Sequence, residues 1–302
     1  MMKKSRMAVP LMLMFVLALS SVGLTQLVTR ASPGDAGLVM KWLGTAGWEI
    51  KTPEGTTILI DPFLTRTQPD REWQWQSNEE VVFKYVKAAD YIFAGHSHAD
   101  HVGDLPLIAR KFGAKIIGSR TTMNLALSAG VDPSQITMIR GGEKLDFKEF
   151  TVDVIPSEHR ISRGRTSPPR LRELYDPVST IMGRHFLIGG SFLYNFTFGS
   201  RRVLHQSTAN FIVENLEGSN PDVALLAQGY RSYDLEAALR AMRPKVIIMH
   251  HFDQWRVPFA EGIKERNERR ARHFRRGIKR VDPRIEVVIP DFLKPYVVNV
   301  EG

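Results

Sequence analysis

The chain has 302 residues, 43% of them hydrophobic, which is enough for a sizeable core in one large domain or two small ones. It contains no cysteine, which excludes disulfides, thiolate zinc sites and a lipid-modified cysteine. The formal net charge is +9, but the basic residues concentrate near the N-terminus and in residues 264–280, so the total alone does not indicate a nucleic-acid-binding protein.

Residues 1–31 have the layout of an export signal or an N-terminal membrane anchor. A basic tip with Lys3, Lys4 and Arg6 precedes an uncharged, largely apolar run at residues 7–29. The run is long enough for a spanning helix, which needs about 20 apolar residues. The basic tip predicts that the rest of the chain crosses the membrane. We therefore expect an exported protein, periplasmic or extracellular after cleavage, or anchored to the membrane; a buried N-terminal helix is the alternative.

Residues 38–300 indicate a single domain without an internal linker. The β-type runs "LVMKWLG", "GWEIKT" and "TTILIDPFL" come first, and a polar stretch with Trp73 and Trp75 follows them. Strands and helices then alternate, which predicts an α/β protein with two sheets packed face to face and helices outside. The strands are expected at residues 91–95, 115–118, 136–140, 150–156, 191–198, 202–205, 223–227 and 245–250, and the helices at residues 105–112, 122–128, 235–242 and 259–279.

A cluster of metal-ligating side chains follows the predicted strand at residues 91–95. The stretch "FAGHSHADHVGD" contains three histidines and two aspartates: His96, His98, Asp100, His101 and Asp104. Imidazoles and carboxylates suit zinc and related divalent ions, and α/β proteins commonly bind ligands at strand ends. His159, His250 and His251 also end β-type runs and are the candidate remaining ligands. A polar loop with incidental histidines is the alternative.

The motif His-x-His-x-Asp-His at residues 96–101 resembles the signature of the metallo-β-lactamase superfamily. Its surroundings agree, because "WLGTAGWEI", "ILIDPF", the motif, His159 and a strand-terminal His250 follow in that order. This order is similar to the branch with the ascorbate-phosphate lactonase and the phospholipase D that cleaves N-acyl phosphatidylethanolamines. The resemblance spans about residues 38–300. It implies an αβ/βα sandwich of two mixed sheets, with the metals at one edge between them.

The resemblance also implies one or two divalent metal ions, with zinc favoured and manganese as the alternative. It assigns two sets of ligands: His96, His98 and His159 to the first ion, and Asp100, His101 and His250 to the second. His250 is preferred to His251 because the family ligand closes the apolar strand, although a slip of one residue would exchange them. Asp61 would support the ligand loop or shape a turn.

One departure from the family concerns an aspartate that bridges both metals. The matching place reads "VLHQSTANF", with Ser207 at the expected aspartate, and no carboxylate lies between Arg201 and Val213. His205 and Gln206 are the candidate substitutes. Loss of the shared negative charge should weaken the second ion most, because metal–metal repulsion is less well offset. A single-metal enzyme, an altered metal pair and a degenerate site all stay open.

We predict a metal-dependent hydrolase in which a metal-bound hydroxide attacks an ester, lactone or phosphodiester while Asp100 orients the water. The alternative is a non-catalytic binding or scaffold protein with a degenerate metal site, which Ser207 supports. The expected partner is a small-molecule or lipid substrate, with membrane association. Nucleic acid is not expected as a partner, because the chain is predicted to be exported.

Three further segments each have two interpretations. Trp73 and Trp75 are either packing residues or part of a lid or a lipid-contacting loop. Five arginines in residues 160–172 either grip an anionic substrate or form a solvated loop. The basic helix at residues 259–279 is either a solvated face or a contact for anionic lipid. Its acidic residues are spaced for i,i+4 pairs: Glu265 with Arg269 and Glu268 with Arg272.

Overall fold

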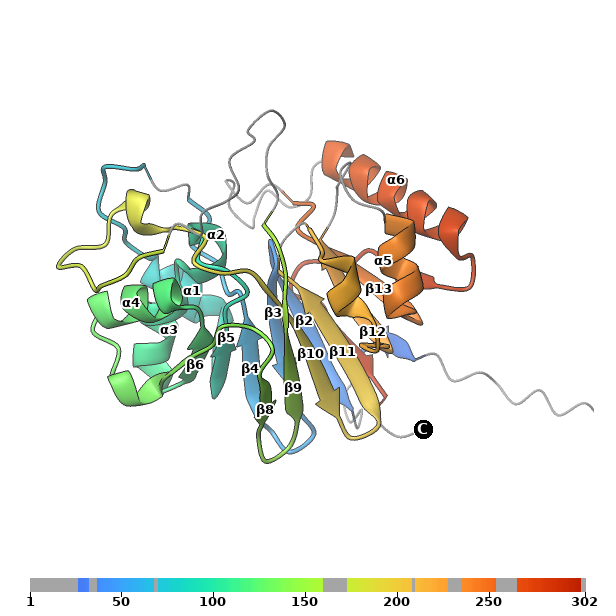
Figure 1. The fold of residues 1–302 in the computed structure, drawn as a ribbon, viewed down its shortest axis with the longest axis horizontal. Coiled ribbons are helices and arrows are strands. Elements are labelled where there is room, and N and C mark those ends of the chain that lie inside the picture. Colours follow the sequence, from blue (N-terminus) through green and yellow to red (C-terminus); the bar gives the residue numbers. More distant parts are fainter. Residues whose placement is uncertain are drawn as a thin grey trace, which may run out of the picture.

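The computed structural model describes residues 27–32, 37–67, 70–159, 173–207, 210–227, 235–253 and 265–299. Over these residues, the chain forms two β-sheets that pack face to face, with helices on their outer faces (Figure 1). The αβ/βα sandwich predicted from the sequence is therefore confirmed.

In the described part of the chain, the first sheet has eight strands in the order β1-β15-β2-β3-β4-β5-β6-β7. Strands β2 to β4 are antiparallel, whereas β4 to β7 run parallel. The bounds are β1 Val28–Arg30, β2 Leu38–Gly44, β3 Gly47–Lys51, β4 Thr57–Ile60, β5 Tyr91–Phe93, β6 Lys115–Gly118, β7 Ile136–Met138 and β15 Pro295–Val298.

The second sheet has seven strands within the described ranges, in the order β14-β13-β12-β11-β10-β9-β8. Strands β11 to β14 are parallel, and β8 to β11 are antiparallel. The bounds are β8 Lys144–Asp146, β9 Thr151–Pro156, β10 Phe192–Phe198, β11 Arg201–Gln206, β12 Val223–Ala227, β13 Val246–His250 and β14 Glu286–Val288.

Helices α1 to α4 cover the first sheet, and α5 and α6 cover the second (Figure 1). Their bounds are α1 Glu79–Tyr85, α2 Ala99–Val102, α3 Leu105–Phe112, α4 Arg120–Ser128, α5 Leu235–Met242 and α6 Glu265–Val281. The sequence did not predict α1, because its polar surroundings hide the helical pattern. Asn78 caps it by accepting the Val81 N–H at 3.1 Å on Oδ1.

The period-2 alternation of the strands separates two hydrophobic clusters. On β5, Phe93 faces the core between the sheets, whereas Ile92 faces the helices outside the first sheet. Trp42, Trp48 and Tyr194 are fully buried in the core between the sheets. Burying one such ring contributes about 1.5–3 kcal/mol, so the aromatic core fixes how the two sheets face each other.

The N-terminal segment predicted at residues 1–31 lies mostly outside the described residues. Its last residues form β1, which pairs with β15 and buries Val28. The folded domain therefore extends further toward the N-terminus than residues 38–300. In the part of the chain that the structure describes, no helix is long and apolar enough to span a bilayer.

One edge of the sandwich collects the ends of several strands. Strands β4 and β5 run parallel in the first sheet, and β9, β11 and β13 share one direction in the second. The residues that follow these strands include Asp61, His96, His159, Ser207 and His251. The topology thus brings side chains from five separate segments together at that edge.

Candidate metal centre

A tight approach between two loops positions the first histidines. Gly95 follows β5, and its N–H donates to Asp61 Oδ1 at 2.8 Å. A Cβ at Gly95 would lie 2.0 Å from the Cβ of Ser207, so only glycine allows this contact. The chain then passes through His96 and His98 into the short helix α2.

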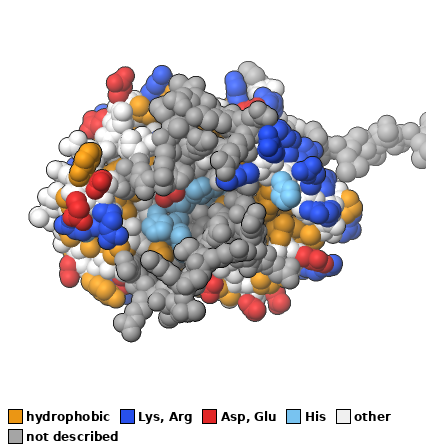
Figure 2. All heavy atoms as spheres, turned by 90° about the horizontal axis from the view of Figure 1, so that it is seen from above, with side chains coloured by type: hydrophobic (Ala, Val, Ile, Leu, Met, Phe, Trp, Pro, Cys, Tyr) orange, Lys and Arg blue, Asp and Glu red, His pale blue; other side chains and the backbone are white. Residues whose placement is uncertain are grey.

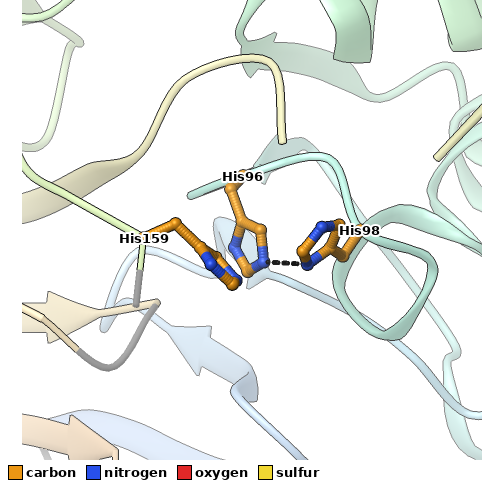
Figure 3. Close-up of side chains that lie close together, drawn as sticks. All are labelled: His96, His98 and His159. Carbon is orange, nitrogen blue, oxygen red and sulfur yellow. Dashed lines mark hydrogen bonds between the residues drawn. The ribbon is translucent and has the colours of Figure 1, made fainter. Parts of the chain in front are cut away.

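Three imidazoles form the first group of ligand atoms. His96 Nε2 lies 3.1 Å from His98 Nδ1, and the His159 ring is 4.9 Å and 4.6 Å from these two rings. Figure 3 shows the three side chains close together, with the His96 and His98 nitrogens facing each other. One nitrogen from each residue lies within 4.8 Å of the other two. The structure therefore brings together the three residues predicted for the first ion.

Asp100, His101 and His251 form a second group, again with ligand atoms within 4.8 Å of one another. Asp100 Oδ2 lies 3.7 Å from His101 Nε2 and 3.5 Å from His251 Nε2. The rings of His96 and His101 are 3.9 Å apart, so the two groups adjoin. Two imidazoles and one carboxylate are a donor set that suits zinc or manganese.

The preference for His250 as a ligand does not agree with the structure. His250 is fully buried, its Nδ1 accepts the Trp48 Nε1–H at 2.9 Å, and its Nε2 contacts the Gln206 carbonyl at 2.8 Å. Both ring nitrogens are thus engaged in the core. His251 instead takes a left-handed backbone conformation with φ 55°, which turns its side chain toward Asp100. The slip of one residue is therefore corrected in favour of His251.

Burial and neighbouring charges together shift the pKa values of His96 and His98 in one direction and the pKa of His251 in the other. Burial and then the neighbouring imidazoles lower the pKa of His98 to about 4, and burial also depresses the pKa of His96. Both rings are therefore neutral at pH 7 and keep a lone pair for a metal. Burial alone would lower the pKa of His251, but the hydrogen bond and charge of Asp100 raise it above its usual value.

Asp61 orients His101 by a hydrogen bond to Nδ1, the ring nitrogen that faces away from Asp100. His101 Nδ1–H donates to Asp61 Oδ2 at 2.9 Å, which leaves the Nε2 lone pair facing Asp100. Asp61 also has a positive φ of 46° and receives the Gly95 N–H. Of its two sequence interpretations, the structure supports both, because one residue shapes the turn and orients a histidine.

Ser207 does not lie between the two groups of ligand atoms. Its Oγ donates to Asp61 Oδ2 and lies 3.2 Å and 3.4 Å from the Nδ1 atoms of His101 and His96. These are the ring nitrogens opposite the Nε2 atoms of the two groups. Ser207 therefore contacts the two imidazoles on their Nδ1 side, away from the ligand atoms, and does not replace a bridging aspartate.

The two candidate substitutes for that aspartate point elsewhere. His205 is fully buried, and its Nε2–H donates to the Ala46 carbonyl at 2.8 Å. Gln206 Oε1 accepts the Ala227 N–H at 3.1 Å. Asp100 is consequently the single carboxylate in the two groups found among the described residues.

A buried ion pair beside the second group was not predicted from the sequence. Asp253 accepts from Arg66 Nη1 at 2.8 Å and from the Thr45 N–H at 3.1 Å. The Thr45 carbonyl in turn accepts the His251 N–H at 2.8 Å. The spacing of Asp253 two residues after His251 is the one local hint that sequence reasoning could have used.

The two tryptophans and the arginine-rich loop are the remaining sequence candidates. Trp75 packs between Phe63 and Phe186 and donates its indole N–H to the Gly103 carbonyl at 2.8 Å, so the packing interpretation holds for it. Trp73 is 74% exposed. The arginine-rich loop at residues 160–172 falls outside the described residues.

Comparison with known proteins adds a family and a fold. A family model described as a β-lactamase superfamily domain matches residues 39–251. A UPF0173 protein of Pyrococcus abyssi is 28% identical over 261 residues, which cover 84% of this chain and 96% of the relative. A protein of Polynucleobacter asymbioticus, named a UPF0173 metal-dependent hydrolase, is 27% identical over 222 residues, 70% of this chain and 73% of that protein.

Two solved structures have the same fold. A metallo hydrolase from Ignicoccus hospitalis superposes with a TM-score of 0.58 at 19% identity, over 85% of this chain and 97% of that chain. A metallo-β-lactamase fold protein from Bacillus subtilis gives a TM-score of 0.54 at 13% identity, over 86% and 99% of the two chains. The sandwich and its strand-end edge are therefore common to these proteins.

Proposed function

Because the chain belongs to the β-lactamase superfamily and is a metal-dependent hydrolase, we propose that it cleaves an ester, a lactone or a phosphodiester with water as the nucleophile. The observation that carries this proposal is the pair of adjoining ligand groups, His96–His98–His159 and Asp100–His101–His251. Their nitrogens and carboxylate suit one or two zinc ions, with manganese as the alternative.

A divalent ion bound there would lower the pKa of a water ligand toward about 7 and so supply hydroxide at neutral pH. No protein nucleophile competes for this role among the described residues beside the histidines. Ser97 Oγ is held by Ser119 and Thr122 at 2.9 Å and 2.8 Å, and Ser207 Oγ donates to Asp61. The chain has no cysteine. Water is therefore the nucleophile that the site favours, and carbonyl and phosphoryl centres are its targets.

Asp100 has the position for moving protons. Burial would raise its pKa, but the charges of His101 and His251 and the hydrogen bond from His251 outweigh burial and hold it low. The carboxylate is therefore ionised at neutral pH and can accept a hydrogen bond from an attacking water. As the water attacks, the carboxylate can take a proton from it and then deliver that proton to the leaving oxygen.

His101 contributes through its fixed tautomer. Asp61 accepts from Nδ1, so Nε2 presents its lone pair toward the second group. The same carboxylate also binds the loop at Gly95, which leads directly into His96. Asp61 thus sets the position of one ligand from each group.

The test is metal quantification and hydrolase screening of the wild type beside His98→Ala. Loss of one imidazole from the first group should lower the bound metal and reduce turnover at least about 100-fold. His273→Ala is the matched control, because His273 is exposed on α6, far along the chain from both groups. It should keep both metal and activity.

The rival function is a non-catalytic binding or scaffold protein. The absence of a carboxylate between Arg201 and Val213 favours it, because the metals would share no bridging charge. Less than one metal equivalent in metal-replete protein, with equal turnover in wild type and His98→Ala, would support the scaffold and reject the hydrolytic site.

A further inference from the structure

Helix α6 has an apolar face and a strongly basic face. Ala271, Phe274 and Ile278 are buried against the second sheet and α5, at the spacing expected of one helix face. The opposite side is exposed and carries mainly arginine side chains. We call this side the basic face; its residues are Arg269, Arg270, Arg272, His273, Arg275, Arg276 and Arg280.

Little of this charge is neutralised within the described residues. Arg272 pairs with Glu268 at 3.1 Å along the helix, as the sequence spacing predicts. Arg270, Arg275 and Arg276 have no carboxylate partner in the part of the chain that the structure describes. Like charges at i,i+4, such as Arg272 and Arg276, cost a few tenths of a kcal/mol per pair. A helix selected only for solubility would mix the two signs.

The basic face lies on the same side of the molecule as the metal centre. Figure 2 looks onto that side and shows the pale blue histidines of the centre near the middle, with Lys and Arg side chains gathered toward one end around a separate pale blue side chain. Figure 1 places α6 over the second sheet, above the end of β13 that leads to His251. A partner bound to the basic face would therefore lie on the same side of the molecule as the metal centre.

The N-terminal sequence leads to the same end of the sandwich. The uncharged apolar run at residues 7–29 includes the first two residues of β1, whose Val28 pairs with Val298. β1 is the outer strand of its sheet, and β14, directly after α6, is the outer strand of the other. Both outer strands and α6 lie at one end in Figure 1. A membrane-inserted segment would hold this end at the lipid surface.

We propose that the basic face of α6 binds an anionic lipid surface and turns the metal centre toward the bilayer. Arginines near such a surface gain electrostatic attraction to the headgroups, and the apolar segment before β1 supplies the second contact that stable membrane binding needs. Nucleic acid would also match the charge, but an apolar segment of this kind directs a chain to a membrane. This contact is separate from the bond that the enzyme cleaves.

The absence of cysteine allows a direct test on the full chain, because one introduced cysteine is a unique labelling site. An environment-sensitive fluorophore is attached at His273→Cys on the basic face, or at Lys148→Cys in the exposed loop between β8 and β9. Each protein is reconstituted with vesicles of phosphatidylcholine, or of equimolar phosphatidylcholine and phosphatidylglycerol, that carry headgroup quenchers. We expect quenching at position 273 with the anionic vesicles only, and none at position 148.

Two charge-matched variants then show whether binding to anionic vesicles depends on the basic face or only on the net charge of the protein. Arg270→Gln, Arg275→Gln and Arg276→Gln together should lower quenching-monitored affinity for the anionic vesicles on the order of 100-fold, since each arginine contributes roughly fivefold. Lys51→Gln, Lys87→Gln and Lys148→Gln remove the same charge from exposed positions on other elements and should leave that affinity unchanged. Glutamine keeps the helix propensity, and unchanged circular dichroism and metal content confirm folding.

Three results would overturn the lipid contact. Equal quenching at position 273 in both kinds of vesicle would show that charge plays no part. An equal loss in the lysine variant would show that only net charge matters. Retained vesicle quenching in the arginine variant, together with lost binding to a short duplex DNA, would assign the basic face to nucleic acid.

Discussion

The guanidinium of Arg66 donates to the carboxylate of Asp253 at 2.8 Å, and the two side chains are only 2% and 0% exposed. Asp253 also accepts the Thr45 N–H, and Thr45 accepts the His251 N–H. The ion pair therefore links three loops beside the second ligand group, namely those that contain Thr45, Arg66 and His251. Thr45, Arg66 and His251 all have positive φ, so these contacts stabilise backbone conformations that the residues would not prefer on their own.

Arg66→Gln should destabilise the protein by about 3–5 kcal/mol, because it leaves Asp253 as a buried carboxylate without its cation. The measurement is the free energy of unfolding in urea. Arg30→Gln is the control, since the Arg30–Asp291 pair is 66% and 54% exposed and should contribute less than about 1 kcal/mol. Equal losses in the two variants would mean that the buried pair has no special role.

Asp61→Asn should weaken metal binding about 10–100-fold while the chain stays folded, because an amide no longer fixes the His101 tautomer as a carboxylate does. Competition with a chromophoric chelator measures the affinity. Ser207→Ala is the graded control, since it removes one hydroxyl donor to Asp61 and keeps the His101 bond. We expect a smaller loss for Ser207→Ala, and a reversed order would remove Asp61 from the role of orienting His101.

His251→Ala and His250→Ala separate a ligand from its structural neighbour. His251→Ala should lower the metal content of the second group, because it removes one of three ligand atoms. His250→Ala should keep the metal and cost about 2–5 kcal/mol of stability, since it leaves a cavity and an unpaired Trp48 indole. Metal analysis and urea unfolding of both variants provide the comparison. The opposite pattern would restore His250 as the ligand.

Sequence reasoning worked where chemistry and spacing are local. His96, His98, Asp100 and His101 follow one strand within six residues, and His159 ends another, so their types and positions predict a shared site. The alternating strands likewise predicted the sandwich. Local sequence patterns cannot predict which side chain reaches the site where a single backbone angle determines its direction. His250 and His251 are equivalent in the sequence, and the φ of 55° at His251 selects between them.

Contacts between residues that are far apart in the sequence were even harder to predict from local patterns. Arg66 and Asp253 are 187 residues apart, and nothing around Arg66 indicates a buried cation. Ser207 was read as the residue at the bridging position, yet its direction depends on the close packing of Gly95 against it. Such details follow from how the two sheets pack, which no single segment encodes.

The pH dependence of metal uptake should distinguish the two ligand groups. In the metal-free protein, burial lowers the pKa of His98 to about 4, whereas Asp100 raises the pKa of His251 above its usual value. His98 is thus already deprotonated at neutral pH, but an ion entering the second group must displace a proton from His251. As pH falls below the raised pKa, affinity at the second group should drop by up to about tenfold per pH unit.

His98 should stay available to the first ion until the pH approaches about 4, the pKa of its ring. Zinc titration by calorimetry, in two buffers of different ionisation enthalpy near neutral pH, would reveal proton release from one binding event and not from the other. In His251→Ala, the remaining binding event should show only the profile of the first group. Loss of both events together near pH 6.5 would contradict the difference in charge between the two groups, because their histidines would then titrate alike.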